Sequence, residues 1–401
     1  MNGNLGASGP SADGLPLDGV RIIDFSRLLP GPWCTQMLAD MGAEVIKVEQ
    51  PGIGDLGRHN PPRYKDTSVY FNSVNGGKRS IALDLSGEEG RTRVHDLIRE
   101  ADVVIESFRK GVPARLGIDY DSANWTRPEI IYCSITGFGQ TGPLAPIPGH
   151  DLAIQAVSGV MGIAPRQAQE APAMPGFQAA DYAAACYGVM GILGALLRRR
   201  TTGRGCYIDL SMFDSLFSMT NLVSSAAMAR AAGGDGQPAI EIWGKNPRYA
   251  TYVTRDGGAV AVSLLEARAW AAFCQLIGRP DLVAGDEGPE DRLSAHPEQA
   301  ERYRRAIADV CLAHNRDELV RWMTDNDVPV LPVHTPDEAI RCDHVQARDL
   351  LRWTEHPTDG RIPMLANPLV RAGLAEPGGR RPAPALDQDR EEICNGVRHE
   401  H

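Results

Sequence analysis

Short runs of β-branched and aliphatic residues recur through the first half of the chain, separated by amphipathic or turn-rich segments. The runs occupy residues 20–26 (VRIIDFS), 43–49 (AEVIKVE), 101–108 (ADVVIESF) and 129–138 (EIIYCSITGF). Runs of this length and composition are typical of buried β-strands. Strands that alternate with helices imply parallel pairing through crossover helices. The pattern therefore predicts an open, doubly wound α/β domain.

A longer apolar run follows at residues 183–197 (AAACYGVMGILGALL). It is shorter than the roughly 20 residues that a membrane span requires, so we expect a buried core helix and no membrane partner. Asp181 stands just before this run. Burial of a lone carboxylate is costly unless the group is paired or used in chemistry. Two interpretations stay open at this point: a helix cap, worth about 1 kcal/mol, or a reactive group.

The pattern changes after the glycine-rich residues 231–238. Residues 248–265 read as a hairpin that turns at Asp256, Gly257 and Gly258, and a helix follows it. A strand and a cap at Thr335 close this region. We expect a large α/β domain over residues 15–224, a smaller α+β domain over 225–340, and a C-terminal segment over 341–401 that returns to the large domain.

Composition and charge narrow the function. The 401 residues are 43% hydrophobic and carry a net charge of −10, which argues against a nucleic-acid binder, since such proteins need a basic face. The eight cysteines form no CxxC pair, so we expect reduced thiols in a cytoplasmic protein. The ten histidines do not cluster at ligand spacing, so no metal site is expected. Pro30 and Pro32 occupy the turn after the first predicted strand, where a dinucleotide-binding protein would carry glycines. This argues against an NAD-dependent enzyme.

Several of these stretches resemble the class III CoA-transferases, a family that includes carnitine CoA-transferase, formyl-CoA transferase and the α-methylacyl-CoA racemases. The matching stretches occupy residues 16–55, 75–85, 101–121, 130–143, 149–162 and 180–196, in the family's order. The resemblance implies a cytoplasmic, interlocked homodimer. It also implies a Rossmann-like large domain with a parallel sheet, a smaller α+β domain, and CoA bound at the edge of the large domain.

The resemblance also assigns roles to residues. Asp181 matches the position of the nucleophilic aspartate that carries CoA from an acyl-CoA to a small carboxylic acid, through an anhydride and a thioester on the protein. Coenzyme A is then the substrate and acyl carrier. Cations beside glycines and an aromatic residue suit its phosphates. We expect CoA contacts from Arg27, Leu28, Pro30, Lys78, Arg79, Ser107, Phe108, Arg109, Arg115 and Leu116.

His150 keeps two alternatives open. It stands where many transferases of the family carry tyrosine and where the racemases carry histidine. A pair formed by His150 and Asp181 could remove a proton from one face of the α-carbon of an acyl-CoA and return one to the other face. The chain could thus be a 2-methylacyl-CoA racemase, in which both residues are catalytic. A CoA-binding homologue without catalytic activity is the second alternative.

Overall fold

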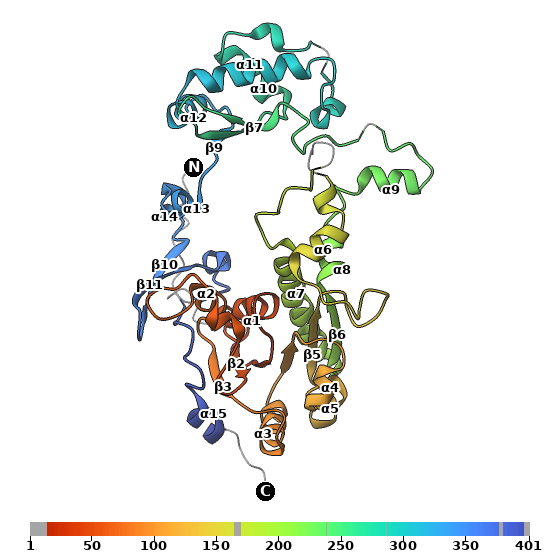
Figure 1. Cartoon of the computed structure of the whole chain (residues 1–401), viewed down its shortest axis with the longest axis vertical. Helices are drawn as coiled ribbons and strands as arrows, with labels where there is room; N and C mark the ends of the chain where they lie inside the picture. Colours follow the sequence, from red (N-terminus) through yellow and green to blue (C-terminus); the bar gives the residue numbers. More distant parts are fainter. Residues whose placement is uncertain (1–13, 164–169, 238, 286, 377–379, 397–401) are drawn as a thin grey trace. The chain divides into compact units, whose positions relative to one another are not determined.

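The computed structural model describes residues 14–163, 170–237, 239–285, 287–376 and 380–396 (Figure 1). The described chain forms two compact units. The first comprises the chain up to Gln155, Phe177–Ser218 and the chain from Cys342, and the second comprises Ala156–Gly176 and Met219–Arg341. The boundaries near 218 and 341 lie close to the divisions expected at 224 and 340. The segment Ala156–Gly176 groups with the second unit instead of the first.

The first unit is built on six parallel strands in the order β3-β2-β1-β4-β5-β6. The strands are β1 (Arg21–Asp24), β2 (Glu44–Glu49), β3 (Arg79–Ala82), β4 (Val103–Glu106), β5 (Ile131–Thr136) and β6 (Cys206–Ser211). Ile22 of β1 pairs with Val45 on one side and Val103 on the other. The predicted α/β class and parallel sheet are confirmed. The chain reverses its direction of travel across the sheet between β1 and β4, and ligands bind at such a switch point in doubly wound sheets.

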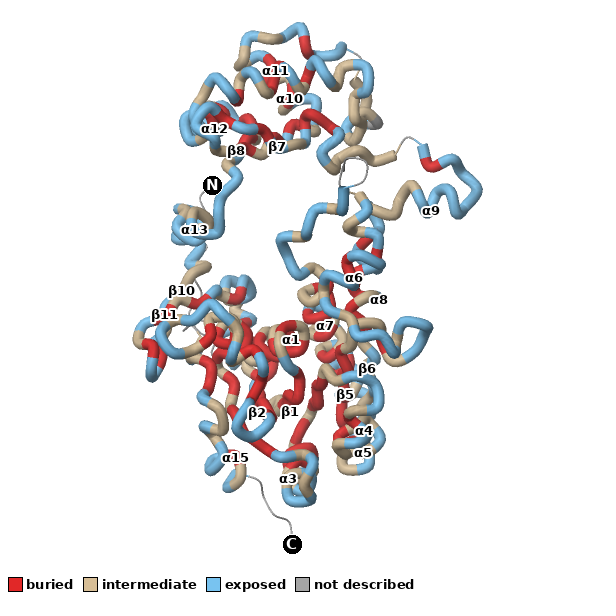
Figure 2. The backbone as a smooth tube through the Cα atoms, viewed as in Figure 1, coloured by how far each residue is buried: buried red, intermediate tan, exposed pale blue. Residues whose placement is uncertain are grey.

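Both faces of this sheet are covered, and Figure 2 shows its strands largely buried. On one face, Ile23, Val104 and Tyr132 join a buried cluster with residues of α3 (Glu88–Arg99) and α5 (Tyr120–Thr126). Because successive side chains of a strand alternate between faces, Ile22 and Val103, which are also fully buried, lie on the other face.

Helix α7 (Ala179–Thr202) packs against α1 (Pro30–Asp40), α8 (Met212–Ser218), β5 and β6. It is 24 residues long, and among the described residues it is a helix long and apolar enough to cross a membrane by length and composition alone. A Cβ at Gly188 would lie 2.9 Å from the Cys34 sulfur. The small residues of the apolar run therefore permit close packing of α7 against α1.

The C-terminal chain lies against β3. Asp389 and Asp387 accept hydrogen bonds from the backbone N–H groups of Ser80 and Ala82, both at 2.8 Å. The remaining elements of this unit are α2 (Val69–Asn75), α4 (Val112–Leu116), α6 (Asp151–Val157, which ends in the second unit), α14 (Asp343–Ala347), the hairpin β10 (Leu351–His356) and β11 (Gly360–Leu365), and α15 (Arg390–Gly396).

The second unit contains an antiparallel sheet of β7 (Tyr249–Val253), β8 (Ala259–Ser263) and β9 (Val330–Pro332). Trp270, Phe273 and Ile307 lie in its buried core. The helices are α9 (Ser225–Ala231), α10 (Ala267–Leu276), α11 (Ala300–Ala313), α12 (Arg316–Thr324) and α13 (Pro336–Ala339). The predicted hairpin is confirmed, and so is the Thr335 cap, which accepts from the backbone N–H of Glu338.

Candidate active site

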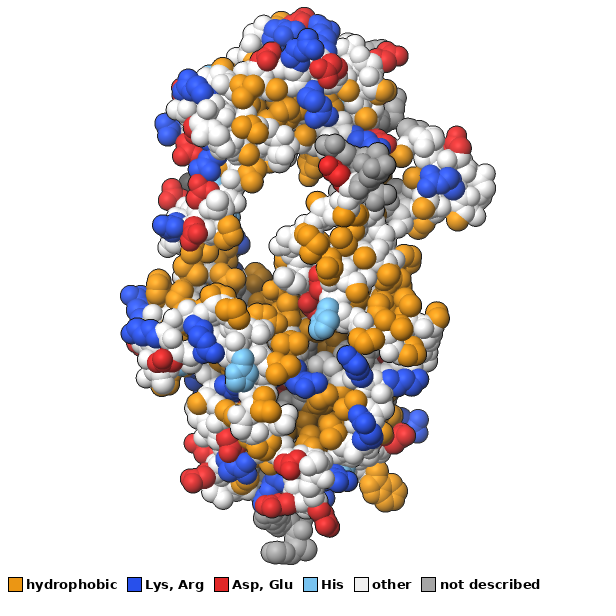
Figure 3. All heavy atoms as spheres, viewed as in Figure 1, with side chains coloured by type: hydrophobic (Ala, Val, Ile, Leu, Met, Phe, Trp, Pro, Cys, Tyr) orange, Lys and Arg blue, Asp and Glu red, His pale blue; other side chains and the backbone are white. Residues whose placement is uncertain are grey.

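A cleft of about 750 Å³ opens beyond the carboxyl ends of β1, β4 and β5. Each of these strands sends its following turn into the wall, as expected for a doubly wound sheet. In Figure 3, blue Lys and Arg side chains border orange hydrophobic surface near the positions of β5 and α4. The cleft is lined by residues 27–30, Leu56, Tyr70, residues 107–110, 135–139 and 145–150, Asp181 and Met212.

Asp181 lies in the first turn of α7 and lines this cleft. Burial, followed by the negative charge of Asp151, raises the pKa of Asp181 from 3.8 to about 7. Tyr70 from α2 and Tyr182 are close enough that the Asp181 carboxylate adds to burial in raising the pKa of each phenol. The carboxyl group is therefore poised to change charge near neutral pH.

The structure excludes the interpretation of Asp181 as a helix cap. The residue before α7 is Gln178, and no side chain of the N-cap residue accepts a hydrogen bond there. The first N–H groups of α7 are instead met by Asp151, which lies on α6. The Asp181 carboxylate therefore does not cap α7, and it is available for chemistry.

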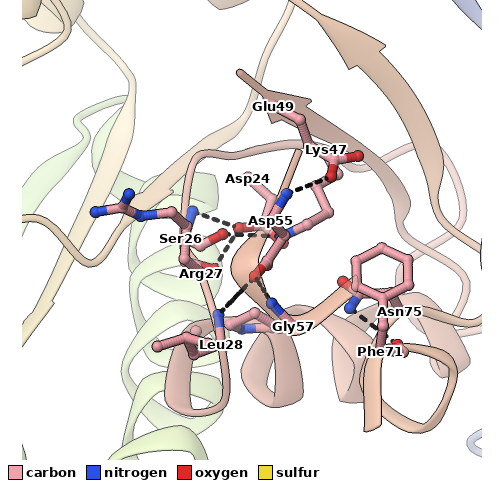
Figure 4. Close-up of polar contacts among 12 residues, drawn as sticks. Asp24, Ser26, Arg27, Leu28, Lys47, Glu49, Asp55, Gly57, Phe71 and Asn75 are labelled. Carbon is pink, nitrogen blue, oxygen red and sulfur yellow. Dashed lines mark hydrogen bonds and ion pairs between the residues drawn. The ribbon is translucent and has the colours of Figure 1, made fainter. Parts of the chain in front are cut away.

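The turn after β1 rests on a buried cluster of charges, shown in Figure 4. Lys47 pairs with Asp55 at 2.9 Å, and both side chains are almost completely buried. Asp55 accepts from the backbone N–H of Leu28 at 3.2 Å and from that of Gly57 at 2.8 Å. Leu28 has a φ of 63°, a left-handed conformation that costs a leucine about 1 kcal/mol or more. The buried carboxylate thus fixes a strained turn at the edge of the cleft.

Asp24 anchors the start of the same turn. It accepts from the backbone N–H of Ser26 at 2.8 Å and from the Thr35 hydroxyl at 2.7 Å, and it pairs with Lys78 at 3.2 Å. Burial alone would raise the pKa of Asp24, but the charges of Lys78 and Lys47 outweigh it and lower the pKa to about 2. Asp24 is therefore ionised at neutral pH.

The turn after β4 is tied to the turn after β1. The Ser107 hydroxyl accepts from the backbone N–H of Arg27 at 3.0 Å, and the Arg27 guanidinium lies 4.9 Å from the centre of the Phe108 ring. Glu106 is buried and accepts from the backbone N–H of Phe108 at 2.6 Å. Burial raises the pKa of Glu106 to about 7. The two turns consequently form one connected wall.

A second cavity, of about 300 Å³, shares Arg27 and Phe108 with the cleft. Residues from the ends of β1, β2 and β3 line it, together with Leu116 of α4. Its rim includes residues 83–86, which follow β3. Sequence reasoning missed these residues because only the sheet order brings the end of β3 towards the end of β1.

Most of the residues expected to contact CoA gather at these two cavities. Arg27, Leu28, Pro30, Ser107, Phe108 and Arg109 line the cleft together with His150 and Asp181, and Leu116 lines the second cavity. Three expected cations do not. Lys78 is fully buried against Asp24, Arg79 pairs with Glu44 and Glu392, and Arg115 lies exposed on α4 outside both linings.

The cleft also contains Lys110, from the same cationic stretch as Arg109 and Arg115, and Tyr70, which the sequence did not single out. Lys110 lines it and donates to the carbonyl of Gln140 at 2.7 Å, which ties the turn after β4 to the loop after β5. Tyr70 comes from α2, outside the stretches that carry the family resemblance. In the part of the chain that is described, no group of three or more His, Cys, Asp or Glu residues is arranged to hold a metal ion.

Comparison with known proteins assigns the chain to a family. The model of CoA-transferase family III matches residues 17–390. Succinyl-CoA:mesaconate CoA-transferase of Haloarcula hispanica is 34% identical over 94% of this chain and 96% of its own length. Succinate–glutarate CoA-transferase of Agrobacterium fabrum is 33% identical over 94% of each chain. Acetyl-CoA:oxalate CoA-transferase of Acetobacter aceti is 34% identical over 93% of each.

Solved structures agree with this assignment. The crystal structure of a CAIB/BAIF family protein from Brucella suis matches with a TM-score of 0.78 and 30% identity, covering 96% of this chain and 100% of that one. A hypothetical protein from Mycobacterium tuberculosis matches with a TM-score of 0.77 and 27% identity, covering 95% and 99%. The chain belongs to CoA-transferase family III, and it is an enzyme that transfers CoA.

Proposed function

We propose that this enzyme moves CoA from an acyl-CoA thioester to a small free carboxylic acid, with Asp181 as the nucleophile. One observation carries the proposal: a carboxyl group largely withdrawn from water lines the same cleft as Arg27, Arg109 and Lys110. Cations suit the phosphates of CoA. A carboxylate removed from water is a suitable nucleophile for a thioester, provided that it can ionise.

The reaction has four steps that balance. The Asp181 carboxylate attacks the thioester carbonyl, the C–S bond breaks, and CoA leaves as a thiolate while a mixed anhydride remains. The thiolate attacks the aspartyl carbonyl, which releases the donor acid and leaves an aspartyl–CoA thioester. The acceptor carboxylate then attacks that thioester and expels the thiolate. The thiolate finally attacks the acceptor's acyl carbon, and the new acyl-CoA leaves with Asp181 restored.

This route divides one difficult exchange between two weak nucleophiles into easier steps. The described residues support it in three ways. The first turn of α7 holds Asp181 at the cleft wall, the second cavity offers room beside Arg27 and Phe108 for the far end of CoA, and Tyr70 offers a hydroxyl within the cleft. Coenzyme A is thus the substrate that the site must hold, and no step calls on a metal.

The relatives' names suggest which acids to test first. Succinate, glutarate, mesaconate and oxalate appear in them, so we propose short carboxylic acids, dicarboxylates included, as acceptors. Purified enzyme should be given succinyl-CoA or acetyl-CoA with each acid in turn, and new thioesters should be measured by liquid chromatography and mass spectrometry. Formation of acceptor-CoA and free donor acid in equal amounts supports the proposal. Hydrolysis alone, with no acceptor-CoA from any pair, contradicts it.

His150 distinguishes the transferase from the racemase. It lines the same cleft as Asp181, but its charge is not among the causes that shift the pKa of Asp181. We expect His150→Gln to lower the rate of CoA transfer by less than about tenfold, because no step above passes a proton through it. The measurement is the initial rate, run beside α-proton exchange of a 2-methylacyl-CoA in D₂O. Rapid exchange that His150→Gln abolishes would replace the proposal with the racemase.

The proposal also fixes a pH dependence. Asp181 has a pKa of about 7 in the folded enzyme, so below that value the carboxyl is protonated and cannot attack. We expect kcat/KM for acyl-CoA to rise with pH up to about 7 and then to level off. Glu106 also titrates near 7, so Glu106→Gln is the control. The rise should persist in this variant, and its loss there would assign it to Glu106 instead.

We further propose that the enzyme is a cytoplasmic, interlocked homodimer, as the family resemblance implies. The apolar side chains of Met190, Leu197 and Phe217, exposed on α7 and α8 of the isolated chain, favour burial against a second copy. Sedimentation equilibrium of the full chain at micromolar concentration should give twice the mass of 43.4 kDa. A single-chain mass would contradict the dimer and leave the chemistry to be tested separately.

A further inference from the structure

Asp151 meets the N-terminus of α7 from a neighbouring helix. One carboxylate oxygen accepts from the backbone N–H of Ala180 at 2.7 Å and from that of Asp181 at 3.4 Å. The other accepts from the Gln155 side-chain amide at 2.6 Å, and that amide also donates to the carbonyl of Phe177 at 2.8 Å. Asp151 and Gln155 therefore fasten α6 to the chain on both sides of the N-terminus of α7.

We propose that Asp151 is a positioning residue for Asp181: it holds the reacting carboxylate at the cleft wall through the backbone of α7, and it sets a second negative charge beside it. The inference rests on the proposed function of Asp181 and goes beyond it, because it names the residue that holds Asp181 in place and places a charge near it. Asp151 itself does not line the cleft. It acts on the reaction only through Asp181.

The arrangement reverses the usual effect of a helix N-terminus. Free N–H groups and the helix dipole normally stabilise an anion in the first turn. Here Asp151 occupies the N–H groups of Ala180 and Asp181, so the carboxylate of Asp181 gains little from them. A carboxylate that is less stabilised is more basic, and a more basic carboxylate attacks a thioester more readily once it has ionised. Asp151 thus makes Asp181 harder to ionise, but it makes the ionised carboxylate more reactive.

The other groups around Asp181 do not account for the same effect. Tyr70 faces it from α2 and Tyr182 from α7, and both are phenols with raised pKa values, neutral at pH 7. The cations of the same cleft, Arg27, Arg109 and Lys110, would act in the opposite direction, because positive charge favours an ionised carboxylate. His150 also lines the cleft. Asp151 is the neighbour whose charge adds to burial in raising the pKa of Asp181.

Asp151→Asn is the variant that tests this inference. Asparagine keeps an oxygen that can accept from the N–H groups of α7, but it removes the charge. We expect the rise of kcat/KM with pH to shift by about one pH unit or more to lower pH, a tenfold change in the ionisation equilibrium. We also expect the plateau at high pH to fall, because the nucleophile becomes less basic. A role in folding alone would lower the plateau without moving the rise.

Two variants control the experiment. Asp214→Asn removes an exposed carboxylate from the first turn of α8 in the same unit, and it should leave the pH profile unchanged. Asp151→Glu restores the charge and should return the rise to within a few tenths of a unit of the wild-type position. If Asp151→Asn does not fold, Asp151→Ser, which also keeps an oxygen and removes the charge, takes its place in this experiment and in a second measurement.

That measurement is independent of catalysis. The side-chain carboxyl carbon of Asp181 can be titrated by ¹³C NMR in protein labelled at aspartate, with its signal assigned by its absence from Asp181→Asn. A pKa near 7 in the wild type that changes by less than about 0.3 units in Asp151→Asn, or that drops in Asp214→Asn instead, overturns the inference. A downward shift in Asp151→Asn sustains it even if Asp181 proves not to be the nucleophile, so the two proposals fail separately.

Discussion

Replacing Asp181 with asparagine is expected to lower kcat for CoA transfer on the order of 10³-fold or more, while CoA still binds. Every covalent step of the proposed route passes through this carboxylate, and an amide cannot form the anhydride. The residues that line the cavities for CoA are unchanged in the variant. Initial rates give the first quantity, and calorimetric titration with CoA gives the second.

The same variant has an expected stability that separates chemistry from folding. The pKa of Asp181 is higher in the folded chain than its usual value of 3.8, so the folded state binds more protons and stability falls as pH rises from about 4 to about 7. Removing the carboxyl should therefore stabilise the protein at pH 8, by about 2 kcal/mol or more. A melting temperature that drops together with activity would assign Asp181 a structural role. Activity above about a tenth of wild type would remove it from the mechanism.

Replacing Asp55 with alanine is expected to lower the free energy of unfolding by about 3–5 kcal/mol. The change removes the carboxylate that pairs with the fully buried Lys47, and losing one partner of a buried ion pair is strongly destabilising. It also frees the backbone N–H of Leu28, so the left-handed turn loses its support. Urea denaturation followed by circular dichroism measures the first effect. The second should appear as a raised KM for acyl-CoA.

Two other variants keep this prediction sharp. Asp55→Asn retains an oxygen for the Leu28 N–H, so it should affect KM less than alanine does. Glu301→Ala breaks an ion pair with Arg305 in which both side chains are more than 70% exposed, and such pairs contribute about 0–1 kcal/mol. A loss below about 1 kcal/mol in Asp55→Ala, indistinguishable from that in Glu301→Ala, would contradict the role given to the buried cluster.

The sequence predicted what depends on local pattern. Apolar runs indicated the strands, the run after Asp181 indicated a core helix, and the Asp-Gly-Gly turn indicated the hairpin of the second unit. Ser86 and Glu89 have the spacing of a capping box, which predicts that a helix begins at Ser86 with a side-chain cap. The helix instead begins after Gly87 without a side-chain cap. The Ser86 hydroxyl donates to Asp84 instead, at 2.6 Å. The Asp84 carboxylate, two residues before Ser86, thus competes with the helix N-terminus for the Ser86 side chain.

Ion pairs between residues far apart in the chain limited the prediction of the site. Lys78 was predicted to contact a phosphate because it follows two glycines. In the structure it is buried and pairs with Asp24, which lies more than 50 residues earlier in the chain. Arg79 is likewise held by Glu44 and Glu392. A cation's neighbours in the chain do not reveal the carboxylate that the fold will bring to it. Asp151 was missed for a related reason: the backbone N–H groups of α7 that it accepts from lie 29 and 30 residues away in the chain.

The most direct test is to trap the covalent enzyme during turnover. The wild-type protein is incubated with acyl-CoA and hydroxylamine, digested, and the peptide that contains Asp181 is sequenced by mass spectrometry. We expect an aspartyl hydroxamate at Asp181 that forms only when acyl-CoA is present. Sustained CoA transfer with Asp181 unmodified, or with the hydroxamate on a different residue, would contradict it.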